Sequence, residues 1–282
     1  MLPVVSRRHF LATSAAASTL ALSAISVRAA EETSYNGWPI GIQSYTLRNF
    51  KLDEALRHVK GLGLRHIEFY GAHMPTNSNA DQIAELRKKL ADAGIRRISA
   101  HGVNGFSKDH AANRKLFEFA KAAGIKNITA DPSPDSFDSL DKLCEEFDIR
   151  IAIHNHGPGH RYDKIGDVAK AVKDHHKLIG ACVDTGHVLR SNEDPVAWVR
   201  ELGPRVFALH LKDVAEKTAK THDVVIGSKF LALVDLFKAL KEVKFPADGS
   251  ISLEYESNPQ NPIDDVKQCL AAAQAAIEKA GV

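Results

Sequence analysis

The sequence predicts one α/β domain, a closed (β/α)8 barrel of parallel strands with helices on the outside. A strand-and-helix unit recurs along the chain, in KGLGLRHIEFYG (60–71), LADAGIRRISAHG (90–102) and AKAAGIKNITADP (120–132). In each segment a glycine separates an amphipathic helix from a short β-rich run. Eight such units fill about 250 residues, the usual length of a barrel of this kind.

The helix ends of these units are marked by Gly63, Gly94 and Gly124, which lie 31 and 30 residues apart. A glycine after the last helical turn can adopt the left-handed conformation that closes a helix, and the next apolar residue then packs back on it. We therefore expect a left-handed backbone at all three glycines.

Eight β-rich runs are predicted to be the strands: residues 40–46, 66–70, 97–101, 127–131, 150–156, 180–184, 206–211 and 251–256. Among the helices between and after them, one is expected to begin at Asp194-Pro195 and the last at Asn261-Pro262, each a capping residue followed by proline. A doubly wound open sheet is the alternative, but no predicted strand is followed by a GxGxxG turn.

Residues 1–29 differ from the rest and predict an export signal. Arg7 and Arg8 precede an uncharged Ala/Ser/Leu run with small residues near Ala29, an order typical of a twin-arginine signal. We therefore expect a periplasmic or otherwise exported protein whose residues 30–282 form a single barrel domain. The run is short and rich in serine, so no stable membrane anchor is expected after cleavage.

Charge and cysteine content exclude two classes of protein. Cleavage after Ala29 would remove three arginines and no acid, which takes the formal charge from +2 to −1. A protein with this charge is not a nucleic-acid binder by bulk electrostatics. Cys144, Cys182 and Cys269 have no CxxC spacing, which argues against a disulfide framework or a zinc knuckle.

Polar side chains end nearly every predicted strand. In (β/α)8 barrels the active site lies at the C-terminal ends of the strands. Burying so many polar groups without a ligand would be costly, so this rim is predicted to be a binding site. The residues are Gln43, Glu68, His101, Asp131, His154, His156, Asp184, His210 and Glu254.

A metal site is predicted within this rim. Asp184 in VDTGH, His210 in LHLKD and Glu254 in LEYE offer two carboxylates and one imidazole from three adjacent strands. This mixed oxygen and nitrogen set suits Mn²⁺, Co²⁺ or Zn²⁺, and Mg²⁺ less well. A fourth ligand is expected from the neighbouring strand, which leads into IHNHGPGH (153–160).

Through IHNHGP, VDTGH, HLKDV and SLEYE the chain resembles the sugar phosphate isomerase/epimerase family, which is built on a xylose isomerase-like TIM barrel. The resemblance covers nearly all of the chain after the signal. It implies one divalent ion held by a Glu, an Asp, a His and a second Glu on four successive strands. Asp184, His210 and Glu254 match the last three ligands. His154 replaces the first Glu and is the expected fourth ligand.

Catalytic roles are expected for Glu254, Glu68, His156 and Lys212. Glu254 is the family glutamate that remains, and the family uses its glutamates as acid and base. Glu68 would be a base, an acceptor for a substrate hydroxyl or a partner of Lys212. Lys212 would stabilise a developing oxyanion or form a salt bridge. His156 would contact the substrate or a metal ligand.

Substrate contacts are expected from His101 and His187, which match family positions lining the sugar pocket, and from Gln43 at the end of the first strand. The longest connection, residues 215–230, is predicted to be a lid, an oligomer contact or plain solvated surface. A homo-oligomer is therefore compatible with the sequence.

The expected function is that of a sugar isomerase or epimerase. An ion chelated by a carbonyl and the adjacent hydroxyl acidifies the C–H between them, and loss of that proton gives an enediolate. Export and the lack of a phosphate cradle predict an unphosphorylated sugar or keto-sugar.

Three alternatives are weighed. A metal-dependent lyase or dehydratase acting on an oxidised glycoside is favoured by His154 and by the compartment. A non-catalytic sugar-binding barrel is opposed by the intact Asp184, His210 and Glu254. Abasic-site endonucleases share the barrel but require three ions and a basic surface, which the charge of −1 disfavours.

Overall fold

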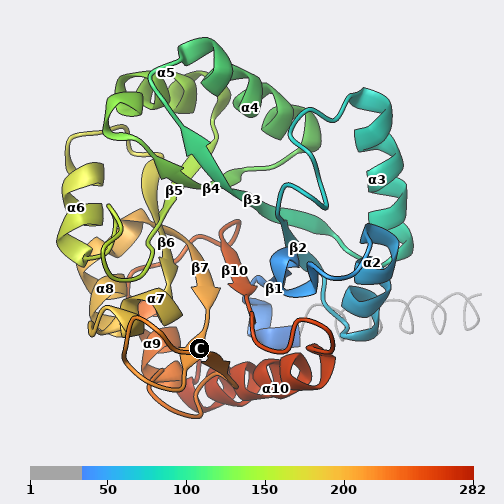
Figure 1. Ribbon diagram of the computed structural model, residues 1–282, viewed down its shortest axis with the longest axis vertical. Helices are drawn as coiled ribbons and strands as arrows, with labels where there is room; N and C mark the ends of the chain where they lie inside the picture. Colours follow the sequence, from blue (N-terminus) through green and yellow to red (C-terminus); the bar gives the residue numbers. More distant parts are fainter. Residues whose placement is uncertain (1–33) are drawn as a thin grey trace, which may run out of the picture. The chain divides into compact units, whose positions relative to one another are not determined.

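A computed structural model describes residues 34–282, and its compact unit Pro39–Val282 is a closed barrel of eight parallel strands (Figure 1). The strands are β1 (Ile40–Gln43), β2 (His66–Phe69), β3 (Arg97–Phe106), β4 (Asn127–Pro132), β5 (Arg150–His154), β6 (Ile179–Asp184), β7 (Val206–Leu211) and β10 (Ser250–Leu253). All eight predicted strands are present. The predicted export signal, residues 1–29, lies outside the described residues.

The strand order β1-β10-β7-β6-β5-β4-β3-β2 makes β5, β6, β7 and β10 consecutive neighbours. Every residue of β6 and β7 is buried, as expected for parallel strands covered on both faces. The register pairs His154 with Cys182, and Asp184 with His210. Ends of strands far apart in sequence are thereby brought to one rim.

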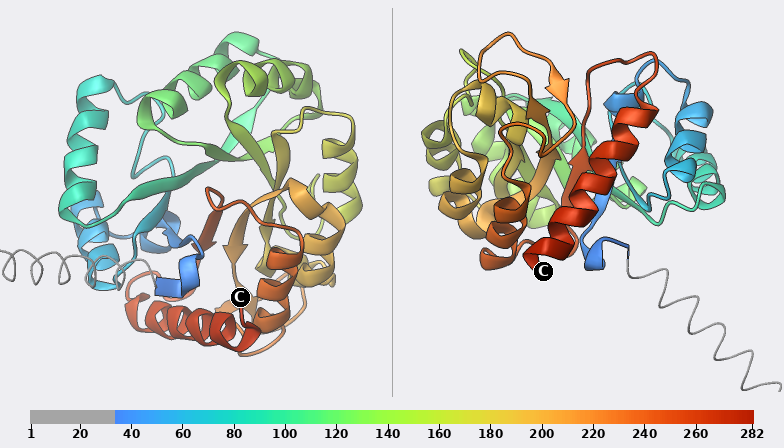
Figure 2. Two further views of the ribbon diagram at one scale, coloured as in Figure 1. Left: turned by 180° about the vertical axis from the view of Figure 1, so that it is seen from behind. Right: turned by 90° about the horizontal axis from the view of Figure 1, so that it is seen from below.

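Helices surround the strands in the front view and in the view from behind (Figure 1, Figure 2). Their apolar faces are turned to the strands, as in α2, which buries Ala55, Leu56 and Val59. No helix in residues 34–282 is long and apolar enough to cross a membrane. The helices are α2 (Leu52–Gly61), α3 (Ala80–Asp92), α4 (His110–Ala123), α5 (Phe137–Phe147), α6 (Ile165–Lys173), α7 (Thr185–Arg190), α8 (Pro195–Leu202), α9 (Leu233–Glu242) and α10 (Ile263–Ala280).

The glycine helix ends are confirmed. Gly63, Gly94 and Gly124 have φ angles of 71°, 75° and 71°. After each glycine an apolar residue is buried and its N–H donates back to a carbonyl of the last helical turn, as at Ile125, whose N–H lies 2.8 Å from the carbonyl oxygen of Ala120.

One of the two predicted helix starts is confirmed and one is wrong. Asp194 caps α8, accepting a hydrogen bond from the N–H of Val196 at 2.9 Å. Asn261 does not cap α10, because Pro262 occupies the cap position and the helix begins at Ile263. Asn261 lies instead in a turn, where its carbonyl accepts a hydrogen bond from the side chain of Asn258.

Two features were not predicted. Strand β3 continues to Phe106, with a shift in its register against β4 between His101 and Asn104. The connection after β7 holds a small antiparallel sheet of β8 (Asp213–Val214) and β9 (Asp223–Val224). Strands of two residues carry no periodic pattern that a sequence could reveal.

Candidate metal centre and pocket

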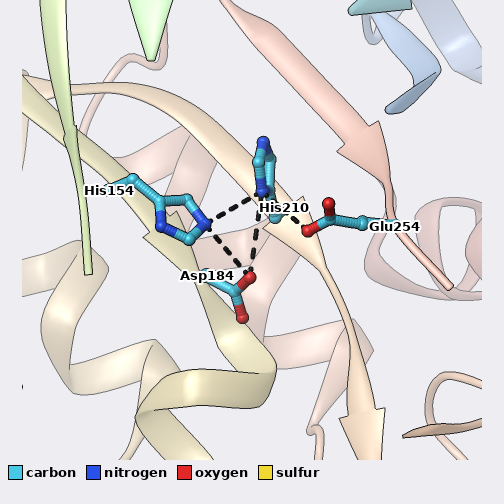
Figure 3. A group of neighbouring side chains, drawn as sticks. All are labelled: His154, Asp184, His210 and Glu254. Carbon is cyan, nitrogen blue, oxygen red and sulfur yellow. Dashed lines mark hydrogen bonds and ion pairs between the residues drawn. The ribbon is translucent and has the colours of Figure 1, made fainter. Parts of the chain in front are cut away.

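The four predicted metal ligands meet at the C-terminal rim of the barrel (Figure 3). His154 ends β5, Asp184 ends β6, His210 lies in β7 and Glu254 directly follows β10. All four are buried, and each offers a ligand atom within 4.8 Å of the others. The sequence prediction that these side chains gather in one cluster is confirmed.

Short distances join the cluster. His210 Nδ1 lies 3.1 Å from His154 Nε2 and 3.0 Å from Glu254 Oε2. Asp184 Oδ2 lies 3.3 Å from His154 Nε2 and 3.8 Å from His210 Nδ1. Two imidazole nitrogens and two carboxylate oxygens thus face a common centre.

These residues fit a divalent cation. Asp184 Oδ2 is buried and makes no regular hydrogen bond among the described residues, its nearest contacts being the ion pairs with His154 Nε2 at 3.3 Å and with Lys212 Nζ at 3.4 Å, although a carboxylate oxygen at this depth ordinarily has a hydrogen bond. Its other oxygen, Oδ1, accepts a hydrogen bond from the N–H of His187 at 2.8 Å, which holds the carboxylate in place. Two nitrogen and two oxygen donors suit Zn²⁺, Mn²⁺ or Co²⁺ better than Mg²⁺.

Lys212 places a positive charge beside the cluster. Its ammonium lies 2.8 Å from Glu254 Oε2 and 3.4 Å from Asp184 Oδ2, and it also pairs with Glu256. Burial opposes its charge, but the carboxylates of Asp184 and Glu254 hold the pKa of Lys212 well above its ordinary value. Burial raises the pKa of Asp184, yet the nearby His187 and Lys212 outweigh it and keep that pKa well below its ordinary value. The salt bridge that the sequence suggested as one role of Lys212 is therefore present in the structure.

Glu68 lies behind His210, fully buried. Its Oε2 is 3.1 Å from His210 Nε2, and it accepts hydrogen bonds of 2.6 Å from the hydroxyls of Thr129 and Ser252. Burial raises its pKa, but His210 and these hydrogen bonds bring the pKa of Glu68 below its ordinary value. The partner of Glu68 is His210 and not Lys212, so the Glu68 carboxylate orients the imidazole ring of His210.

A pocket of about 450 Å³ opens over the cluster. It contains five of the predicted catalytic and substrate-binding residues, namely Gln43, His156, His187, Lys212 and Glu254. A second hollow of about 330 Å³ shares the walls formed by His187, Arg190, Lys212 and Glu256. The full lining of the first pocket is Gln43, Tyr45, Tyr70, Gly71, Gly102, Val103, His154, His156, His187, Arg190, Lys212, Glu254 and Glu256.

The predicted histidines differ in position. His156 and His187 line the pocket, and burial lowers the pKa of each to about 3, so both are neutral at pH 7. His101 does not reach the pocket. Its ring is held by the carbonyl of Met74 at 2.8 Å and by Asn104 at 3.1 Å, and the register shift of β3 turns the next residues to the pocket instead.

A sequence model described as the xylose isomerase-like TIM barrel matches residues 56–274. The chain belongs to this family.

Relatives within the xylose isomerase-like barrels are distant. An inosose dehydratase of Bacillus thuringiensis is 26% identical over 217 residues, 70% of this chain and 65% of that protein. An inosose dehydratase of Clostridium tetani is 29% identical over 120 residues, 41% of this chain and 37% of that protein. The chain thus spans less than two thirds of the length of these relatives.

Solved structures share the fold over most of the chain. An uncharacterized protein of Parabacteroides distasonis has 30% identity and a TM-score of 0.66, over 85% of this chain and 99% of that one. A 3-keto-D-glucoside 4-epimerase of E. coli has 15% identity and a TM-score of 0.65, over 84% of this chain and 99% of that one. At that identity the epimerase shows a common fold alone.

Several pocket residues of this xylose isomerase-like barrel were not predicted from the sequence. Tyr45 and Tyr70 follow β1 and β2, and Val103 lies in β3 two residues after His101; none of the three has a side chain typical of a metal ligand or of acid–base catalysis at neutral pH. Glu256 and Arg190 also line the pocket, where Glu256 pairs with Lys212 and Arg190 contacts His187. Glu256 could have been found, because LEYE places it two residues after Glu254 and side chains two apart in an extended segment share a side.

Proposed function

We propose that the protein is a metal-dependent lyase that acts on an unphosphorylated keto-sugar or oxidised glycoside. The observation that carries this proposal is the pairing of Glu254 with Lys212, a carboxylate and an ammonium 2.8 Å apart that both line the pocket above the metal cluster. His154 stands where the resemblance leads us to expect a second glutamate. One base and one acid suffice for an elimination, whereas an epimerase needs two proton carriers on opposite faces of one carbon.

The names of the relatives agree with this choice. The inosose dehydratases that match at 26% and 29% identity are, by name, enzymes that remove water from a ketone of a cyclic polyol. The epimerase of similar fold acts, by name, on a keto-glucoside. A carbonyl on a sugar-like ring is common to both.

Each chemical step has a group in the pocket. A bound divalent ion, held by His154, Asp184, His210 and Glu254, would polarise the substrate carbonyl and so acidify the neighbouring C–H. The carboxylate of Glu254 takes that proton, and the electron pair forms a C=C bond as the C–O bond one carbon further along breaks. The ammonium of Lys212 stabilises the departing oxygen and gives it a proton, so that water or an alcohol leaves and an unsaturated ketone remains.

An epimerase or isomerase is the second candidate. It is favoured by the neutral imidazoles of His156 and His187, which line the same pocket as Glu254 and offer a second site for proton transfer. Removal of the first proton is the same as in the lyase. The two reactions then differ in whether the carbanion is reprotonated or expels an oxygen.

The test begins with metal analysis of the wild-type protein and of Asp184→Ala. We expect about one divalent ion per wild-type chain and none in the variant. The metal-loaded protein is then incubated with methyl 3-keto-glucoside in D₂O and followed by NMR. An unsaturated ketone supports the lyase, and deuterium with an inverted centre supports the epimerase.

Lys212→Met separates the two steps of the lyase. Proton exchange should persist, while elimination falls by about a hundredfold or more, the usual contribution of a general acid. Absence of both metal and exchange in the wild type would instead support the non-catalytic sugar-binding barrel.

We also propose export by the twin-arginine route, on the sequence of residues 1–29 alone. Replacing Arg7 and Arg8 by lysine should leave the protein in the cytoplasm. Cell fractionation with an antibody against the barrel measures this, and unchanged export of the double variant would contradict the proposal.

A further inference from the structure

Few large apolar side chains are exposed among the described residues, and two of them line the pocket. Within the described part of the chain three are more than a third exposed: Tyr45 at 37%, Val103 at 42% and Phe230 at 42%. Tyr45 and Val103 line the pocket above the metal cluster together with the half-buried Tyr70. Phe230 lies elsewhere, in the connection after β7, with the Lys217 ammonium over its ring.

The two tyrosines are held in a fixed arrangement. Their rings meet edge to face with centroids 5.4 Å apart. The Arg48 guanidinium lies 4.6 Å from the centroid of the Tyr45 ring, and Arg48 also donates a 2.8 Å hydrogen bond to the carbonyl of Glu256. An aromatic surface that is already ordered binds a flat ring at little further cost in entropy.

This rim adjoins the metal ligands at β1, which pairs with β10, and extends from there over β2 and β3. Tyr45 and Tyr70 follow β1 and β2, and Val103 is in β3, whereas the cluster is built on β5, β6, β7 and β10. The pocket therefore extends from a polar end with the metal cluster to an apolar end. A sugar ring bound at the polar end would direct one of its substituents to the apolar end.

The neighbouring hollow is a poor alternative for an apolar substituent. Its walls carry charged groups, among them Lys212, Arg190, Asp223 and Glu256. Covering these groups with an apolar ring would remove their solvation without supplying partners. Tyr45, Tyr70 and Val103 are uncharged at neutral pH, so covering their rings or methyl groups does not remove the solvation of an ionised side chain.

We propose that Tyr45, Tyr70 and Val103 form a subsite for a flat apolar ring attached to the reacting sugar, so that the substrate is a ring-bearing glycoside and not a free monosaccharide. The ring is an aryl group or the C–H face of a second pyranose, which present the same chemistry to the rim. The proposal rests on the proposed function in one respect, that the reacting keto-sugar occupies the metal end.

Calorimetry on the metal-loaded Lys212→Met variant, in which elimination is slowed, measures binding at the subsite with little contribution from turnover. The variants that follow are made in this background. The probes are the 3-keto forms of methyl glucoside, 4-nitrophenyl glucoside and cellobiose. We expect one or both ring-bearing probes to bind about tenfold more tightly than the methyl glycoside, the gain typical of an added aromatic contact. Which of them gains identifies the ring as aryl or pyranose.

Variants locate the effect. Tyr45→Ala and Val103→Ser should abolish the preference, so that the ring-bearing probes bind no more tightly than the methyl glycoside, whereas Tyr45→Phe should retain the preference. Phe230→Ala removes a comparably exposed ring away from the pocket and should change nothing. Circular dichroism confirms that each variant is folded.

The two failures are distinguishable. If the methyl glycoside binds but no ring improves its affinity, the subsite is refuted and the proposed function stands. If no keto-glycoside binds, both are refuted. If light scattering shows that Tyr45→Ala changes the oligomeric state while the probe preference is unaffected, the rim is a contact between subunits and the proposal is overturned.

Discussion

Replacing Glu68 by glutamine should weaken metal binding although Glu68 does not face the pocket. Its carboxylate accepts hydrogen bonds from the hydroxyls of Thr129 and Ser252 and lies 3.1 Å from His210 Nε2, which fixes the ring so that Nδ1 points to Asp184 and Glu254. A glutamine of the same size offers one acceptor oxygen in place of two and carries no charge. His210 then loses the anion that orients it.

The size of the effect follows from these contacts. A hydrogen bond between a carboxylate and an imidazole is worth about 1.5–3 kcal/mol when buried. Loss of an outer carboxylate partner of a ligating histidine lowers metal affinity by about ten- to a hundredfold, or about 1.4–2.8 kcal/mol. We therefore expect Glu68→Gln to raise the Kd for Zn²⁺ by this factor and to lower stability by a few kcal/mol.

Competition with a chromogenic chelator measures the Kd of wild type, Glu68→Gln and the control Thr129→Val. The control removes one hydrogen bond to Glu68 but keeps its charge, so its metal affinity should stay near that of the wild type. The pKa of Glu68 is lower in the folded state than in the unfolded state. Its carboxylate therefore stabilises the fold at pH values above the ordinary pKa of a glutamate, and this stabilisation is lost as the pH falls through the lowered pKa. Equal Zn²⁺ affinity of folded Glu68→Gln and wild type would refute this account of Glu68.

Two further predictions concern the surroundings of the cluster. In Gly186→Ala the new Cβ would lie 2.7 Å from Lys212 Cβ, so we expect Lys212 to shift and turnover to fall about ten- to a hundredfold. The control is Gly166→Ala, whose new Cβ would have nothing within 4 Å and which should keep full activity. Burial raises the pKa of Asp223 from 3.8 to about 6, so its ionisation costs stability as pH rises through this range. Asp223→Asn, freed of metal by chelation, should match the wild-type Tm near pH 4 and exceed it above pH 6; a constant difference in Tm would contradict the assignment.

Sequence reasoning located the metal cluster because a barrel of parallel strands makes the position of a strand end predictable. Asp184, His210 and His154 each end or nearly end a strand. The pairing of neighbouring strands brings them together regardless of the length or conformation of the connecting loops. Glu254 follows the last strand in the same way. Periodicity and motif spacing therefore placed Asp184, His210 and Glu254 together, whereas His154 was added by the resemblance to the isomerase/epimerase family.

The same reasoning could not assign side chains whose direction depends on an irregular backbone. His101 was placed in the sugar pocket, but the register of β3 shifts after it and exposes Gly102 and Val103 there instead. Tyr45 lies in a 3-10 turn directly after β1, which no alternation pattern predicts. The contact between Glu68 and His210 could not be predicted either, because it joins β2 and β7, which are not neighbours, and depends on which of their residues lie at the same level inside the barrel.

One substitution connects the metal site to the reaction. With His154 in place of a glutamate, the cluster holds two carboxylates and two imidazoles, and the ammonium of Lys212 adds a positive charge beside them. Fewer anions around a cation leave more of its charge to be satisfied by substrate oxygens, and nitrogen donors favour Zn²⁺, Co²⁺ or Mn²⁺ over Mg²⁺. The same exchange removes a base and leaves Glu254 as the one carboxylate that belongs to both the cluster and the pocket lining. In the proposed lyase, affinity for the ion and the choice of elimination over epimerisation would thus be linked through position 154.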